Sequence, residues 1–393
     1  MFFEAVVIGG GINGLGTARA LVKRGVKEVA LVEQFEVGGK HGGSHGDARI
    51  TRSAYSDAAY VKLMQRVHAE EWPALETDLG RQLVFPAAGC FFGRGERWKK
   101  YLAAVMELPH EEGGGVELLD PDAAAKRFPM FRFEGIEEAL CDHTAGALAA
   151  GRTVSGLKAW LADHGVMIRE NTAMESFDRG GATLKLKTSA GTIETKRAAI
   201  TAGAWLGKLV PAMAPALSVL RQTVAYVRYD VPPEAQRLGS FPTWCFIDEA
   251  TNDFFYGLPE FETPGAKLGR HRTAGENDPL VAAGPPSKEA VADLSEFLDE
   301  RMTWKVAEIL AAEHCLYAAT PDEDFRIGLL PGDPRIAIGS ACSGHGFKFG
   351  PWTGRAIAEL LLDGESKALA EAELTERFAI SGGSAPGAVP RGG

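Results

Sequence analysis

Cysteine is scarce in this chain of 393 residues, which has five in total. They are few and odd in number, and no two have a CxxC spacing, which argues against a disulfide framework or a thiolate zinc site. A reducing, cytoplasmic setting is therefore expected. The sequence also lacks HxH, HExxH and clustered carboxylates, so no metal is predicted.

Long hydrophobic runs are missing as well. The longest apolar runs, such as Ala5–Ile8, are far shorter than the roughly 20 residues that a membrane span needs. Met1–Ala5 contains Glu4 and has no basic segment, so we expect no signal peptide. There is no Lys/Arg-rich run, and the net charge is −10, which argues against a nucleic-acid or anionic-membrane partner.

The length and composition are those of a globular protein with two to three domains, or one two-lobed fold, at about 150 residues per domain. The end of the chain differs from the rest. Residues 381–393 are rich in Gly, Pro, Ser and Ala and are expected to form a flexible tail.

The N-terminus contains a dinucleotide-binding pattern. A short apolar strand (Ala5–Ile8) runs into Gly9-Gly10-Gly11-Ile12-Asn13-Gly14, which is GxGxxG, and an amphipathic helix follows up to Gly25. A second strand, Val29–Val32, ends at Glu33, 19 positions beyond Gly14, where a carboxylate accepts hydrogen bonds from an adenosine ribose. Gly9 allows the tight turn, Gly11 lets the backbone approach a pyrophosphate, and Gly14 lets helix and strand pack closely.

Two later segments favour a flavin over a nicotinamide. Gly38–Arg52 is a glycine-rich loop with two histidines and two arginines, where regular βα units would otherwise continue. Ile336–Gly350 reads as strand, glycine-rich turn and helix, and such a turn can bring a helix N-terminus or Lys348 to the pyrimidine edge of a flavin.

The strand and helix patterns predict two interleaved domains in an α/β (α+β) fold. A Rossmann-like FAD-binding domain is expected from residues 1–85, 145–215 and 320–380. A substrate domain built on a mixed or antiparallel sheet is expected from 86–144 and 216–319. Helices are predicted over Ala58–Leu79, Thr153–Gly165 and Pro285–Ala312, and strands over Leu184–Thr188 and Ala198–Thr201.

Motifs along nearly the whole chain resemble the monomeric sarcosine oxidase family of FAD-dependent amine oxidases, which includes N-methyltryptophan oxidase and pipecolate oxidase. Besides Gly9–Gly14, they are Ser44–Arg52, Gly203–Trp205, Tyr256–Pro259, Lys267–His271, His314–Tyr317 and Ser343–Phe349.

The resemblance implies FAD as cofactor, attached covalently through Cys315. It also implies a set of residues around the cofactor: Gly9, Gly11, Ile12, Asn13, Gly14, Glu33, Gln34, Ser44, Met174, Gly203, Trp205, Gly344, His345, Gly346, Phe347 and Lys348.

For the reaction, the resemblance implies oxidation of the carbon beside a secondary amine, with electrons passing to oxygen to give hydrogen peroxide. Lys267 matches the lysine that activates oxygen, and Arg49 and His45 match groups near the flavin ring. Arg52 and Lys348 match the pair that binds the substrate carboxylate. Tyr256 and His271 match groups that line the substrate side, and Cys245 aligns with a residue of the pocket wall. Tyr317, two residues past Cys315, is expected to place its ring or hydroxyl in the same cavity as a catalytic group.

The expected partners are a small amino acid substrate and oxygen, in a monomer or small homo-oligomer. Ser44 and Cys245 depart from the family pattern, where histidine and methionine are common, so the substrate is open between sarcosine, a larger N-methyl amino acid and a cyclic imino acid. A flavin dehydrogenase on the same scaffold and a non-catalytic FAD-binding subunit are the alternatives.

Overall fold

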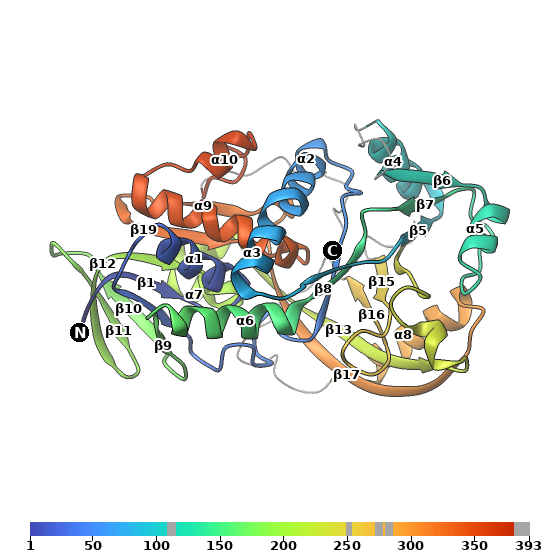
Figure 1. Cartoon of the computed structure of the whole chain (residues 1–393), viewed down its shortest axis with the longest axis horizontal. Helices are drawn as coiled ribbons and strands as arrows, with labels where there is room; N and C mark the ends of the chain where they lie inside the picture. The colour runs from blue at the N-terminus through green and yellow to red at the C-terminus, as the bar shows by residue number, and fades with distance from the viewer. Residues whose placement is uncertain (108–114, 249–253, 272–277, 280–285, 381–393) are drawn as a thin grey trace.

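The computed structural model describes residues 1–107, 115–248, 254–271, 278–279 and 286–380. The described strands form two eight-stranded sheets and a three-stranded sheet. In Figure 1 the first large sheet lies on the left with the N-terminus, and the second lies on the right.

The first sheet is the predicted Rossmann-like one. Its centre is β12, which pairs in parallel with β1 on one side and β19 on the other, while β2 and β9 extend it beyond β1. β10 and β11 add an antiparallel ribbon next to β12, and β18 pairs with β19. The bounds of its strands are β1 (Phe2–Ile8), β2 (Val29–Val32), β9 (Met167–Arg169), β10 (Met174–Asp178), β11 (Leu184–Thr188), β12 (Gly191–Ile200), β18 (Arg326–Leu330) and β19 (Asp333–Ser340).

The apolar run of β1 is buried on both faces because the first sheet separates two cores. Ala5 and Val7 pack against helices α1, α6 and α9, whereas Val6 and Ile8 face the core under the β10–β11 ribbon. Alternate side chains of a strand point to opposite faces, so a strand with both faces covered is apolar at every position. The helices of the described chain are α1 (Ile12–Lys23), α2 (Ala58–Arg66), α3 (Trp72–Leu79), α4 (Gly95–Met106), α5 (Pro121–Arg127), α6 (Ala150–Asp163), α7 (Leu206–Leu209), α8 (Lys288–Arg301), α9 (Gly350–Asp363) and α10 (Lys367–Glu371).

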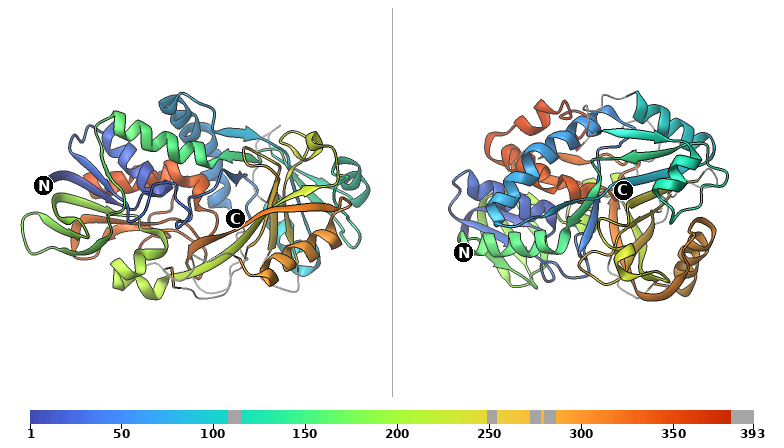
Figure 2. Two further views of the ribbon diagram at one scale, coloured as in Figure 1. Left: turned by 90° about the horizontal axis from the view of Figure 1, so that it is seen from below. Right: turned by 45° about the vertical axis from the view of Figure 1, so that its right-hand side comes forward.

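The second sheet is largely antiparallel. Its longest pair is β13 with β17, and the strands continue through β16, β15, β14 and β5, the β14–β5 pair being parallel. Figure 2 shows the two long strands running along the length of this domain, with α8 packed beneath them. The bounds are β5 (Gly89–Gly93), β6 (Val116–Leu119), β7 (Ala139–Asp142), β13 (Ser218–Tyr229), β14 (Thr243–Ile247), β15 (Phe254–Leu258), β16 (Ala266–His271) and β17 (Val306–Ala319).

The small third sheet lies between the two large ones. It consists of β3 (Ala48–Thr51), β8 (Gly146–Ala149) and β4 (Val84–Pro86), in the order β3-β8-β4. Because β3 follows the glycine-rich loop directly, the loop residues lie where the two domains meet.

The predicted fold class, an α/β protein with a parallel cofactor sheet and a largely antiparallel substrate sheet, is confirmed. The strands of the first sheet all fall in residues 1–85, 145–215 and 320–380, and those of the second in 86–144 and 216–319. The exact domain boundaries stay a prediction. The tail predicted at 381–393 lies outside the described residues.

One secondary-structure prediction was wrong. The helix expected over Pro285–Ala312 ends at Arg301, and Val306–Ala312 begins the long strand β17. This segment contains three Ala, a Glu and a Leu, which favour helix locally, but pairing along the length of β13 outweighs that preference. By contrast, the helix expected over Ala58–Leu79 is present as α2, a π-helical turn at Val67–Glu71 and α3.

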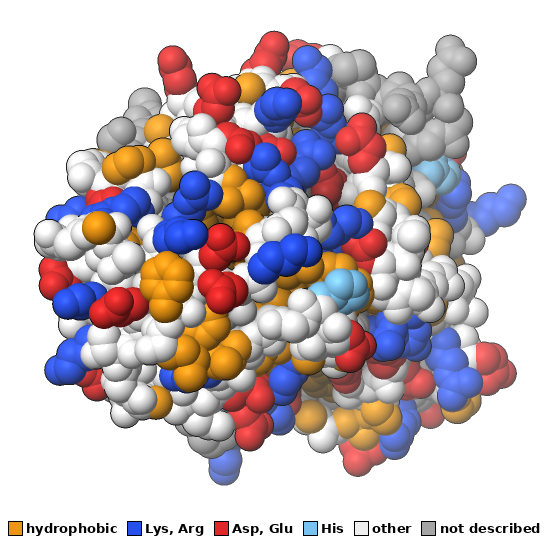
Figure 3. All heavy atoms as spheres, turned by 60° about the vertical axis from the view of Figure 1, so that its left-hand side comes forward, with side chains coloured by type: hydrophobic (Ala, Val, Ile, Leu, Met, Phe, Trp, Pro, Cys, Tyr) orange, Lys and Arg blue, Asp and Glu red, His pale blue; other side chains and the backbone are white. Residues whose placement is uncertain are grey.

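None of the helices in the described part of the chain is both long and apolar enough to cross a membrane. On the face drawn in Figure 3, acidic and basic side chains are interspersed and neither sign forms a broad patch.

Candidate cofactor and active site

The glycine motif forms the predicted turn between β1 and α1. Gly9 has a φ of +105°, which favours glycine, and a Cβ at Gly14 would collide with the carbonyl oxygen of Gly9. At the N-terminus of α1, the N–H of Ile12 donates to Oγ of Ser44 at 3.0 Å. The glycine-rich loop is therefore held directly against the helix end that attracts phosphate.

Glu33 lies at the end of β2, as predicted. Its carboxylate accepts hydrogen bonds from the backbone N–H of Gly10 at 2.7 Å and of Phe35 at 2.9 Å. These bonds fix the carboxylate at the edge of the sheet beside the glycine turn, which is where a dinucleotide ribose binds in this class of fold.

A cavity of about 390 Å³ runs along this edge. The predicted cofactor residues on its wall are Gly9, Gly11, Ile12, Asn13, Glu33, Gln34, Ser44, Met174, Gly203, Trp205 and Phe347, together with His45. Gly14 is absent from the wall because it packs on Gly9. The side chain of Asn13 also holds the fold together, since it donates to the carbonyl of Ala341 at 3.0 Å and accepts from Thr353 at 2.7 Å.

Several residues of this wall were not singled out from the sequence. Phe35 stacks on His41 with ring centroids 4.1 Å apart and meets Trp205 edge-on at 5.6 Å. Cys342 and Lys208 also line the cavity. The position of Phe35 directly after Glu33-Gln34 was the available signal, because that segment follows the ribose-binding strand end.

A second, smaller cavity of about 70 Å³ lies at one end of the first. The two share Gly43, His45, Cys342 and Phe347 in their walls. The smaller one brings together predicted site residues from five distant segments: Arg49, Tyr256, Lys267, Cys315, Tyr317, Gly344, His345, Gly346 and Lys348. A long cofactor lying in the large cavity would place its far end here. The backbone cradle, the strand-end carboxylate and the continuous cavity fit FAD.

Lys267 projects from β16 and is buried, with 7% of its surface exposed. Its Nζ lies 3.4 Å from the carbonyl oxygen of Ala48 and 5.6 Å from the centre of the Tyr226 ring. Burial and the nearby charge of Arg49 lower the pKa of Lys267 to about 7. The residue can therefore gain or lose its charge near neutral pH.

Arg49 and His45 are held by the backbone of the glycine-rich loop. The guanidinium of Arg49 donates to the carbonyls of Ala48, Gly43 and His45 at 2.8, 3.0 and 2.6 Å. Nδ1 of His45 lies 2.7 Å from the carbonyl oxygen of Gly42. Burial, with the charge of Arg49, lowers the pKa of His45 to about 4, so its imidazole is neutral at pH 7.

Tyr256 and Tyr317 both line the small cavity, and their side chains share a hydrogen bond. Burial raises the pKa of Tyr256 to about 12 and raises that of Tyr317 as well, so both hydroxyls keep their protons. His271 is not on the cavity wall. It packs behind Gly344, stacks on Phe254 at 4.4 Å and lies 3.3 Å from the carboxylate of Glu323.

The two predicted carboxylate-binding cations lie side by side around Tyr55. Nζ of Lys348 donates to the Tyr55 hydroxyl at 2.9 Å, and the guanidinium carbon of Arg52 is 4.2 Å from the centre of the Tyr55 ring. Both side chains are buried, and burial with the charge of Arg52 lowers the pKa of Lys348. Lys348 lines the small cavity, whereas Arg52 and Cys245 lie behind it.

The positive charge of Arg52 acts on the thiol of Cys245. Burial raises the pKa of the Cys245 thiol to about 12, although the charge of Arg52 opposes that rise. Arg52 is also 3.5 Å from the hydroxyl of Tyr101, which in turn donates to the carbonyl of Ala54 at 3.0 Å. Tyr55 and Tyr101 were not predicted from the sequence, because nothing in their local pattern separates them from core tyrosines.

This arrangement defines a class of protein. The model of the FAD dependent oxidoreductase family matches residues 4–360, and the chain belongs to that family. Among curated proteins, it is 30% identical to the monomeric sarcosine oxidase of a Bacillus species over 372 residues, covering 93% of each chain. It is 32% identical to the peroxisomal sarcosine oxidase of Mus musculus over 366 residues, covering 91% of this chain and 92% of that one.

These similarities confirm the family resemblance drawn from the motifs. A solved structure of NikD, described as an unusual amino acid oxidase essential for nikkomycin biosynthesis, superimposes with a TM-score of 0.82. The match covers 98% of this chain and 99% of that chain at 20% identity, which shows a shared fold.

Proposed function

We propose that this protein is an FAD-dependent oxidase of secondary or N-methyl α-amino acids, with sarcosine as the first substrate to test. The substrate would lose two electrons and two protons to become an imine, which water hydrolyses to an aldehyde and an amine. Oxygen would take up the two electrons and two protons to become hydrogen peroxide.

The observation that carries this proposal is a pair of buried lysines at the small cavity. Lys267 and Lys348 are 7% and 2% exposed, and neither forms an ion pair within the part of the chain that the structure describes. Keeping a buried lysine charged without an ion-pair partner is costly. Such groups are retained where an anion binds or where negative charge develops during a reaction.

The two lysines would serve different charges. Lys348, together with the planar fork of Arg52, suits the carboxylate of an amino acid. Lys267 lies near Arg49 and the glycine-rich loop, where a positive charge stabilises the negative charge that forms as oxygen is reduced. Bound FAD supplies the redox chemistry, accepting a hydride equivalent from the substrate and passing electrons to oxygen.

The remaining wall residues would orient the substrate and exclude water. Tyr256 and Tyr317 stay protonated and can donate hydrogen bonds, while burial favours the neutral form of the substrate amine, which is the form that releases hydride.

The experiment is a substrate panel on the purified yellow protein. Sarcosine, an N-methylated larger amino acid and pipecolate are each tested for peroxide release, and the flavin is reduced without oxygen and then mixed with it. Fast reduction by sarcosine and fast reoxidation are expected. Fast reduction with slow reoxidation would identify a dehydrogenase, and no reduction by any of the three would favour a non-catalytic FAD-binding role.

Covalent attachment of FAD through Cys315 belongs to the same proposal. Cys315 is buried on β17 and lines the small cavity, and the next residue, Leu316, lines the large one. Cys342 lines both cavities, so it is a matched control thiol. After acid denaturation, flavin absorbance should stay with the polypeptide in the native protein and in Cys342→Ser, and separate from it in Cys315→Ser. Retention in Cys315→Ser and loss in Cys342→Ser would move the attachment to Cys342.

A reducing, cytoplasmic location is also proposed, supported by the five cysteines, none of which is in a disulfide.

A further inference from the structure

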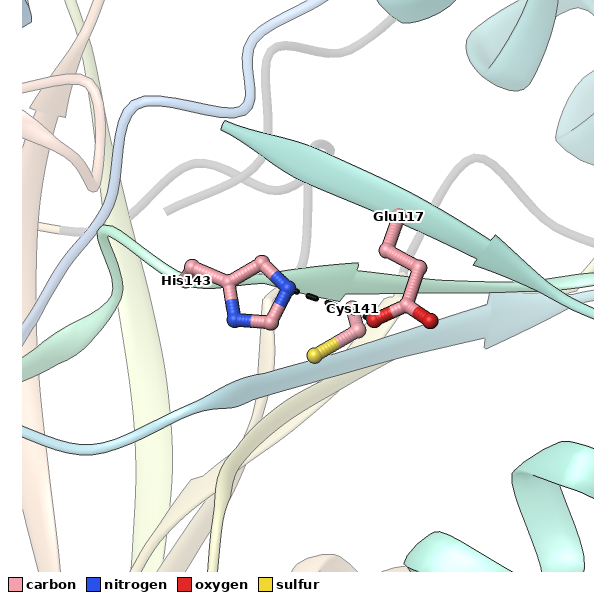
Figure 4. Close-up of side chains that lie close together, drawn as sticks. All are labelled: Glu117, Cys141 and His143. Atoms are coloured by element: carbon pink, nitrogen blue, oxygen red, sulfur yellow. Dashed lines mark hydrogen bonds and ion pairs between the residues drawn. The ribbon is translucent and has the colours of Figure 1, made fainter. Parts of the chain in front are cut away.

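A second group of reactive side chains lies far from the cofactor cavity, at the outer edge of the second sheet. It consists of Glu117 on β6, Cys141 on β7 and His143 directly after β7. One ligand atom from each, a carboxylate oxygen, Sγ and an imidazole nitrogen, lies within 4.8 Å of the other two. Figure 4 shows the three side chains gathered around one point.

Strand register creates this cluster. Glu117 and Cys141 are direct partners in the antiparallel β6–β7 pair, so their side chains lie on the same face. His143 is two positions beyond Cys141, and its Nε2 lies 3.3 Å from Oε2 of Glu117. No short sequence motif predicts this group, because Glu117 and Cys141 are far apart in the chain.

The turn that carries His143 is fixed by hydrogen bonds on both sides. The N–H of His143 donates to the carbonyl of Gly115 at 3.0 Å. Its neighbour Asp142 is buried and accepts from the N–H and hydroxyl of Thr144 at 2.8 and 2.6 Å. The backbone that carries the imidazole is therefore held in place before any ligand arrives, which lowers the entropic cost of binding.

We propose that Glu117, Cys141 and His143 form a binding site for a borderline transition-metal ion of the Zn²⁺ class, with water in the fourth position. Thiolate, imidazole and carboxylate are the ligand types that zinc takes in tetrahedral sites. When the sulfur–metal bond forms, the thiol proton of Cys141 is released to solvent. The site is independent of the oxidase reaction.

One neighbour and the burial of the thiol bear on the affinity. Arg127 donates to Oε2 of Glu117 at 2.7 Å, so a metal would share this carboxylate with a cation or use its other oxygen. Burial raises the pKa of Cys141 to about 11, so the thiol is protonated until a metal displaces the proton. Cys141 is fully buried, whereas Glu117 and His143 are exposed, so the ion would enter from the solvent side.

The test uses the holoprotein after removal of adventitious metal with a chelator. Zn²⁺ binding is measured by calorimetry, and Co²⁺ is added as a spectroscopic probe because thiolate-to-cobalt charge transfer gives an ultraviolet band. We expect one Zn²⁺ per chain and a Co²⁺ band that is absent in Cys141→Ser.

His143→Gln keeps the proposal testable if Cys141→Ser folds poorly, because His143 is exposed. It should weaken Zn²⁺ binding by at least about tenfold, which corresponds to ~1.4 kcal/mol. His164→Gln, an exposed histidine on the C-terminal end of α6, and Cys90→Ala, the thiol opposite Cys141 on β5, should leave binding unchanged. Zn²⁺ binding of equal strength in His143→Gln and Cys141→Ser, or no thiolate band with Co²⁺, would overturn the proposal.

Discussion

Lys348 donates a hydrogen bond of 2.9 Å from its Nζ to the hydroxyl of Tyr55. The ring of the same tyrosine lies under the guanidinium of Arg52 at 4.2 Å. One side chain thus sets the positions of both cations that are proposed to bind the substrate carboxylate. Tyr55 is a positioning residue, since it is not on the wall of the small cavity.

Replacing Tyr55 by Phe keeps the ring under Arg52 and removes the hydrogen bond to Lys348. A hydrogen bond to a charged group contributes about 1.5–3 kcal/mol, so we expect KM for the amino acid to rise about tenfold or more with kcat little changed. Steady-state kinetics measures both values. Tyr229→Phe, at a buried tyrosine in the core of the second sheet, is the control and should leave KM unchanged. A fall in kcat at constant KM would show that Tyr55 does not act through carboxylate binding.

Replacing Lys267 by Met removes the buried charge and keeps much of the side-chain volume. Removing one preorganised electrostatic group costs about 10²–10³ in rate, and here the loss should fall on reoxidation of the reduced flavin by oxygen. Stopped-flow mixing with oxygen measures that step, and anaerobic reduction by substrate measures the other. Lys158→Met, which removes a lysine on α6 that pairs with Glu170, should change neither rate. Equal losses in both steps would mean that Lys267 serves substrate binding instead.

Because the pKa of Lys267 is lowered to about 7, we expect the rate of flavin reoxidation to depend on pH. The ammonium is charged below this value and neutral above it, so reoxidation should slow as pH rises through about 7. A negative charge on the reduced cofactor would favour the ammonium form of Lys267 and move the midpoint of this titration to higher pH. The rate in Lys267→Met should not follow this titration, and a midpoint well below 7 in the native enzyme would contradict the assignment.

The close packing of Gly14 on Gly9 predicts loss of the cofactor in Gly14→Ala. The added methyl group would collide with the carbonyl oxygen of Gly9 and push α1 away from β1. We expect protein purified with little or no flavin and a lower Tm, measured by absorbance and by thermal unfolding. Gly181→Ala, between β10 and β11, is the matched control and should retain flavin, because an added Cβ there makes only ordinary contacts and Gly181 is not on the cavity wall. Full flavin content in Gly14→Ala would mean that helix and strand can separate without loss of binding.

The sequence predicted the cofactor half of the site well because that half is local. Gly9–Gly14 and Glu33 lie within 25 positions, and their spacing alone requires a strand, a turn, a helix and a strand. The substrate half depends on pairing over long separations. Lys267 reaches the small cavity because β16 pairs with β13, and Tyr317 because β17 pairs with the other side of β13. Those residues were found only through the family resemblance.

Other features had no local signal at all. The strand at Val306–Ala312 has a helix-forming composition, and only its pairing with β13 decides its structure. Tyr55 and Tyr101 both lie against Arg52, but Tyr101 comes from α4, 49 positions away in the chain. Glu117, Cys141 and His143 meet through the β6–β7 register, which no spacing rule reveals.

The end of β7 and the turn after it also contact the segment that follows Arg52. Asp142 accepts a hydrogen bond from the N–H of Ala54 at 3.0 Å, and Thr144 accepts one from the N–H of Ser53 at 2.8 Å. The end of the substrate sheet therefore holds, by hydrogen bonds, the backbone of a segment that belongs by sequence to the FAD-binding domain. A chimaera that exchanges the substrate domain between relatives would have to move residues 142–144 and 52–55 together. If only one of the two segments were exchanged, the backbone N–H groups of Ser53 and Ala54 and the carboxylate of Asp142 could lose these hydrogen bonds.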